Sequence, residues 1–102
     1  MTTEKKTTAA QPTPVLVTTE YRGVFFGYLT GEPRRERLTL ERARNCVYWS
    51  ADVRGFVGLA ERGPSAGCRV GPAAPKMTLF GVTSVIECTP EAVARWEASP
   101  WG

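Results

Sequence analysis

Arginine and aromatic side chains in the middle of the chain have the chemistry of an anion-binding site. Arg42 and Arg44 are followed closely by Tyr48 and Trp49 in the segment "ERARNCVYWS". A guanidinium group donates in a planar, bidentate arrangement that fits phosphate, and an aromatic ring stacks on a nucleobase with about 1 to 3 kcal/mol. The segment therefore predicts a surface for a phosphate-bearing ligand, while the same residues also suit a half-buried strand.

A second candidate is the loop over residues 64–75, which is rich in glycine and proline and carries Arg69. Exposed backbone N–H groups in such a loop can cradle an anion. Neither GxxxxGK[ST] nor GxGxxG is present, so a plain connection restrained by its prolines remains the alternative. The candidate ligand-binding residues are Arg42, Arg44, Tyr48, Trp49 and Arg69.

Catalytic and metal chemistry are disfavoured by residue types. The chain has no histidine, which is the commonest general base and metal ligand. Its three cysteines, Cys46, Cys68 and Cys88, lack CxxC spacing, so we expect reduced and mostly buried thiols. Cys68 beside Arg69 has no base to activate it. We expect no catalytic residue, no metal ligand, no cofactor and therefore no enzyme.

Length and composition limit the class of protein. A chain of 102 residues with 42% hydrophobic and 23% charged residues fits one globular domain. The net charge of +3 is too low for strong duplex DNA binding, although arginine outnumbers lysine and favours an anionic partner. Neither a membrane-spanning stretch nor a signal peptide is visible, so we expect a cytoplasmic protein without membrane contact.

The elements that must position these residues are mainly strands. Residues 1–14 predict a flexible arm, and residues 15–102 a single β-rich domain that begins with a hairpin across residues 21–23. The charged stretch 30–37 predicts an exposed loop. Strict alternation from Leu38 to Tyr48 would place leucine, arginine, cysteine and tyrosine on one face, so we expect a break at 41–43 and a fourth strand to about Ser50.

Two helices and two further strands follow. Phe56, Leu59 and Ala60 have helical spacing before a terminating glycine and proline, and two β-prone segments flank Gly81. Thr89 predicts the N-cap of a C-terminal helix whose first position is a proline. The expected fold is α+β but mainly β: a small antiparallel sheet or barrel-like domain with one short internal helix and a C-terminal helix.

The order of four segments resembles a family of small, uncharacterised proteins of tailed bacteriophages and prophages. The segments are "VLVTTEYRGVFFGYL", "LERARNCVYW", "GLAERGP" and "TLFGVTSVIECTPEAV". The resemblance implies a phage accessory protein that acts in the cytoplasm of an infected bacterium. One class of such proteins sequesters cyclic nucleotide or ADP-ribose signals of bacterial immunity.

We therefore expect a non-enzymatic, homo-oligomeric binding module, an anti-defence sponge for a small anionic nucleotide. Trp96 and Trp101 would offer apolar surface to a neighbouring subunit. The alternative is a phage structural or assembly protein, because tryptophan, tyrosine and arginine also anchor protein interfaces. A weak nucleic-acid binder is the third interpretation.

Overall fold

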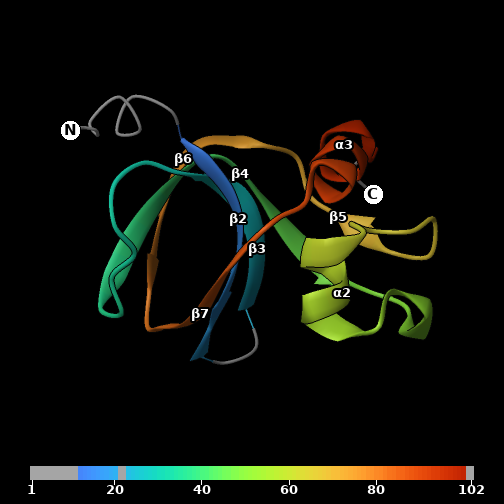
Figure 1. Ribbon diagram of the computed structural model, residues 1–102, viewed down its shortest axis with the longest axis horizontal. Helices are drawn as coiled ribbons and strands as arrows, with labels where there is room; N and C mark the ends of the chain where they lie inside the picture. The colour runs from blue at the N-terminus through green and yellow to red at the C-terminus, as the bar shows by residue number, and fades with distance from the viewer. Residues whose placement is uncertain (1–11, 21–22, 101–102) are drawn as a thin grey trace.

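The computed structural model describes residues 12–20 and 23–100 and contains, within them, one antiparallel sheet of six strands and two α-helices. The elements are β2 (Thr13–Thr19), β3 (Gly23–Leu29), β4 (Arg37–Tyr48), the short 3-10 helix η2 (Ala51–Val53), α2 (Gly55–Glu61), β5 (Arg69–Val70), β6 (Ala74–Phe80), β7 (Val82–Glu87) and α3 (Pro90–Ala98). The strand order is β5-β4-β3-β2-β7, and β6 also pairs with β4 (Figure 1). The mainly β class with an internal and a C-terminal helix is confirmed.

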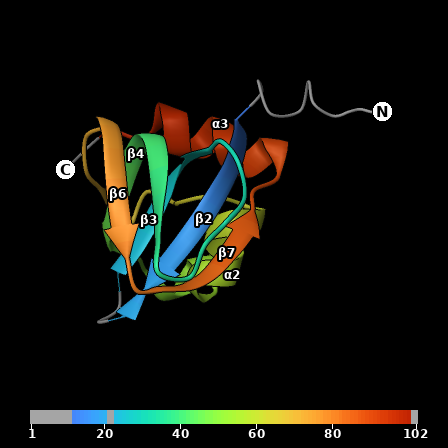
Figure 2. The same ribbon diagram turned by 90° about the vertical axis from the view of Figure 1, so that its left-hand side faces the viewer.

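The sheet is strongly curled, because two strands at its opposite ends follow each other in the chain. β6 pairs with β4 and β7 pairs with β2, yet Gly81 alone joins them, with a left-handed φ of +67° that favours glycine. The loop before β4 passes in front of the curl (Figure 2). It is tied to this junction, since the Val82 N–H donates to the Arg35 carbonyl at 2.9 Å.

Two hydrophobic clusters occupy the two faces of the curled sheet. Inside the curl, the described residues that meet all belong to strands, among them Val15, Val17 and Leu40. On the other face, Leu16 and Phe26 pack under α2 and α3. Because β2 and β3 are covered on both faces, β3 is almost continuously apolar and β2 contains the apolar run 14–17.

The predicted break in the third apolar segment is a β-bulge within one continuous strand. Tyr28 pairs with Glu41 but Phe26 pairs with Arg44, so β4 carries one extra residue opposite Gly27. Arg42 lies in the bulge with a φ of 49°. The bulge shifts the alternation of β4 by one residue, so that every second position faces one cluster before the bulge and the other cluster after it. This shift explains why one set of alternating positions contains mixed residue types. β4 ends at Tyr48, so the separate fourth strand to Ser50 was wrong.

The hairpin of β2 and β3 is confirmed by their antiparallel register, although its expected turn includes residues 21–22, outside the described residues. Most of the expected arm also lies outside them, and its last residues, Thr13 and Pro14, belong to β2. The C-terminal helix begins as expected, because the Thr89 hydroxyl accepts a hydrogen bond from the Ala92 N–H.

Trp96 joins the two helices to the sheet. Its ring stacks on Phe26 with centroids 5.1 Å apart, and its indole N–H donates to the Leu59 carbonyl. The expectation that Trp96 offers surface to another subunit was wrong, because its side chain is fully buried. Trp101 lies outside the described residues. No helix in the described part of the chain is long and apolar enough to cross a membrane.

Candidate functional site

Arg44 is a structural residue of the core. Its guanidinium donates to three backbone carbonyls: Gly71 at 2.7 Å, Trp96 at 2.6 Å and Ser99 at 2.9 Å. The latter two belong to the C-terminal end of α3, where carbonyls lack helical partners and a cation is favoured. Burial lowers the pKa of the Arg44 guanidinium, and the three carbonyls offset that cost. The structure gives no support to the predicted phosphate contact, because all three nitrogen atoms are engaged within the chain.

Arg42 lies over an aromatic ring next to a carboxylate. Its guanidinium carbon is 4.0 Å from the centroid of the Tyr28 ring, and the Tyr28 hydroxyl donates to Glu97. Burial, and then the hydrogen bond to Glu97, raise the pKa of Tyr28 to about 12. Arg42 and Arg44 share a cavity of about 230 Å³ with Glu97. The small volume disfavours a nucleotide-sized ligand there.

The remaining predicted residues lie in two other places. Tyr48 and Arg69 face each other across β4 and β5, and both side chains are exposed. Trp49 is half-buried and lines a groove with residues of β2, β3, α2 and β7. The five candidates therefore do not converge on one cavity of the described structure.

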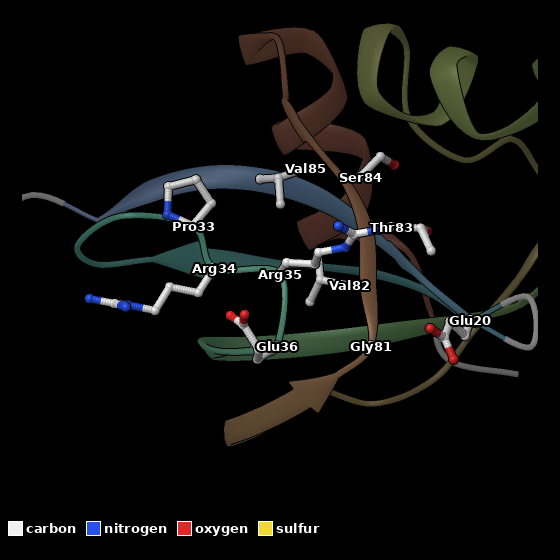
Figure 3. A pocket seen from close by; sticks show the side chains of 10 residues that line it. All are labelled: Glu20, Pro33, Arg34, Arg35, Glu36, Gly81, Val82, Thr83, Ser84 and Val85. Atoms are coloured by element: carbon white, nitrogen blue, oxygen red, sulfur yellow. The ribbon is translucent and has the colours of Figure 1, made fainter.

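A larger groove follows β7, and we call it the β7 groove. It has a volume of about 940 Å³ and is lined by residues 81–85 together with Glu20, Pro33, Arg34, Arg35 and Glu36. Figure 3 shows the Arg35 side chain extending to β7 beside Thr83, whereas Arg34 points in the opposite direction. The groove is therefore lined by one guanidinium that points toward β7 and by hydroxyl-bearing residues of this edge strand.

An aromatic groove of about 560 Å³ adjoins the β7 groove. Trp49 and Phe56 line it, together with the hydroxyl-bearing residues Thr18, Thr83 and Ser84. The last two also line the β7 groove, so the two grooves share part of one strand. The Thr18 hydroxyl lies 2.6 Å from that of Thr83 and 2.5 Å from that of Ser84. These hydrogen bonds hold the three hydroxyl groups in place, and we call these groups the hydroxyl row.

The joined grooves combine three kinds of chemistry. Arg35 supplies a bidentate donor, the rings of Trp49 and Phe56 supply stacking surfaces, and the hydroxyl row supplies donors and acceptors between them. Of these residues, only Trp49 was predicted from the sequence as a ligand-binding residue. The run "VTSV" in β7 and the arginine-rich loop were visible, but nothing in the sequence placed them next to Phe56.

The fold and its grooves define a small, curled antiparallel sheet domain with an arginine-to-aromatic surface along its β7 edge. The chain belongs to the family described as a domain of unknown function (DUF6948), whose family model matches residues 12–96. Neither a curated protein nor a solved structure matches the chain.

Proposed function

We propose that this protein is a non-enzymatic binding protein that holds a small anionic nucleotide in the joined grooves along β7. The observation that carries the proposal is the sharing of Thr83 and Ser84 by the β7 groove, which contains Arg35, and the aromatic groove, which contains Trp49. A ligand that lies across Thr83 and Ser84 would reach Arg35 at one end and the aromatic rings at the other.

The chemistry of each end assigns a part of the ligand to it. Trp49 and Phe56 offer ring surface for a base, where stacking contributes about 1 to 3 kcal/mol. Arg35 offers paired N–H donors for a phosphate, which are stronger than neutral donors. The hydroxyls of Thr83 and Ser84 lie between these ends and suit ribose or phosphate oxygens.

The biological setting follows from the resemblance to phage proteins. A phage accessory protein that binds a nucleotide without altering it would lower the concentration of a bacterial immune signal in the host cytoplasm. The proposed role is therefore that of an anti-defence sponge for a nucleotide signal.

The test is calorimetric titration with cyclic mono-, di- and trinucleotides, followed by denaturation of the complex and chromatography of the released ligand. Arg35→Ala should weaken binding at least about tenfold, while Arg69→Ala, an exposed arginine on β5, should leave it unchanged. Intact ligand after release supports binding without catalysis. An absence of uptake at micromolar protein, or a loss of binding in Arg69→Ala alone, would refute the proposed site.

The aromatic end has its own matched pair on α2. Phe56 lines the aromatic groove and is 39% exposed. Its neighbour Val57 is 56% exposed and does not line the groove. Phe56→Ala should weaken nucleotide binding, and Val57→Ala should not. Circular dichroism of both variants establishes that each is folded.

A second candidate function is supported by apolar surface elsewhere. Val47 and Phe80 are 66% and 67% exposed, and Tyr48 is 55% exposed. Exposed aromatic side chains such as those of Tyr48 and Phe80 are typical of protein interfaces. They favour a phage structural or assembly component, which mass spectrometry of purified virions would detect.

A further inference from the structure

We infer that the ligand contains at least two nucleotides joined by phosphodiester linkages, rather than a single nucleotide or a nucleoside polyphosphate. The inference rests on the proposed function and narrows it. Its evidence is a third groove, the opposite directions of two arginine side chains, the place of a third arginine in that groove, and the carboxylates that line the same grooves.

The third groove extends the surface away from the aromatic end. It has a volume of about 440 Å³ and is lined by Arg34 and Arg37 together with Thr30, Glu32, Thr39 and Thr78. Arg34 also lines the β7 groove, so three grooves adjoin in series. We call the new one the loop groove.

The three grooves together have more volume than a site for one small ligand requires. Sites for drug-sized ligands have volumes of about 300 to 1,000 Å³. The β7 groove alone lies near the upper end of that range at about 940 Å³. The aromatic groove and the loop groove, at about 560 and 440 Å³, add room at its two ends.

The arginines are spread along this surface instead of converging. Arg34 and Arg35 are consecutive, yet Figure 3 shows their guanidinium groups pointing in opposite directions. Two diverging groups do not grip one phosphate together, but each can hold a separate phosphate. Arg37, from the start of β4, adds a donor in the loop groove with Arg34. This spacing suits phosphate groups that recur along a chain of linked nucleotides.

Carboxylates line the same grooves as these cations. Glu20 and Glu36 line the β7 groove with Arg34 and Arg35, and Glu32 lines the loop groove. The surface is therefore close to neutral and offers little net attraction to the dense charge of a triphosphate. A diester carries one charge per nucleotide, and its ribose hydroxyl and base amino groups can donate to the carboxylates.

The experiment compares ligands of equal base and different length. For adenine and for guanine, calorimetry measures the affinity of the 5′-monophosphate, the triphosphate, the cyclic dinucleotide and the linear di- and trinucleotide. We expect the diester ligands to bind at least about tenfold more tightly than the mono- and triphosphate. Arg37→Ala should weaken the di- and trinucleotides about fivefold without affecting the monophosphate.

Arg62→Ala is the matched control, because Arg62 is an exposed arginine that follows α2 and lines none of the three grooves. It should leave every affinity unchanged. If the mono- or triphosphate binds as tightly as the diesters, or Arg37→Ala acts equally on all ligands, the inference fails and the proposed function stands. If no nucleotide binds, the proposed function fails and the inference fails with it.

Discussion

Replacing Arg44 by alanine should destabilise the protein severely, because the guanidinium satisfies three carbonyls that no other described donor reaches in its place. The contact with Trp96 is buried, and the contacts with Gly71 and Ser99 are part-buried. An unsatisfied buried acceptor costs about 1 to 3 kcal/mol.

The expected loss of unfolding free energy follows from these three contacts. We assign about 2 kcal/mol to the buried Trp96 carbonyl, and about 0.5 to 1 kcal/mol to each of the other two, which water reaches once the side chain is gone. The total is about 3 to 4 kcal/mol, a large fraction of the stability of an ordinary domain of about 5 to 15 kcal/mol. Arg44→Lys should lose less, since its ammonium keeps the charge but does not span all three acceptors.

Urea unfolding followed by circular dichroism measures the effect. Tyr48→Ala is the control, because Tyr48 is 55% exposed, and its stability should stay within about 0.5 kcal/mol of the parent. An Arg44→Ala protein as stable as this control would refute the reasoning. A folded Arg44→Ala protein that has lost only its ligand would show instead that Arg44 is a binding residue.

Substitutions at three further positions, with Gly71 as a control, test the packing and the charges around β4. Gly27→Ala should lower the free energy of unfolding by about 1 to 3 kcal/mol, because the added Cβ would lie 2.8 Å from that of Leu40. Gly71→Ala should be nearly neutral in the same urea experiment, because the nearest atom to its added Cβ is 3.7 Å away. Arg42→Gly should be more stable than Arg42→Ala by about 1 kcal/mol, since both lose the ring contact but only glycine relieves the left-handed φ of 49°; equal stabilities would contradict the strain at the bulge. The pKa of Tyr28 is raised by burial from 10.0 to about 12, so its protonated form stabilises the fold below pH 10 and that contribution is lost as the pH rises from 10 to 12. Tyr28→Phe should remove this part of the alkaline dependence, and ultraviolet titration should find one tyrosine ionising near pH 12 in the parent only.

Local signals in the sequence predicted most elements of the fold. Thr89 and Pro90 predicted the start of α3 because capping depends only on residues within one turn. The mixed alternation around Arg42 predicted an irregularity, although periodicity alone did not distinguish a break between two strands from a bulge in one. The curl depends on β6 and β7 pairing with strands far away in the chain, which local propensity does not encode.

The candidate site was harder to predict because its residues meet only through the tertiary fold. Arg44 looked like a ligand-binding residue, yet its partners lie 27 to 55 positions away. Arg35 belongs to the charged stretch 30–37 that was expected only to be an exposed loop, and the curl of the sheet brings this loop to β7. Trp49 was identified by type, but its partner Phe56 lies on α2, which was expected only to pack.

The most direct test of the proposed site is the chemical-shift map of the isotope-labelled protein titrated with a cyclic dinucleotide. The account predicts perturbations at the backbone amides of Thr83 and Ser84 and at the indole N–H of Trp49. Perturbations confined to Tyr48 and Arg69, or an unchanged spectrum at millimolar ligand, would contradict it.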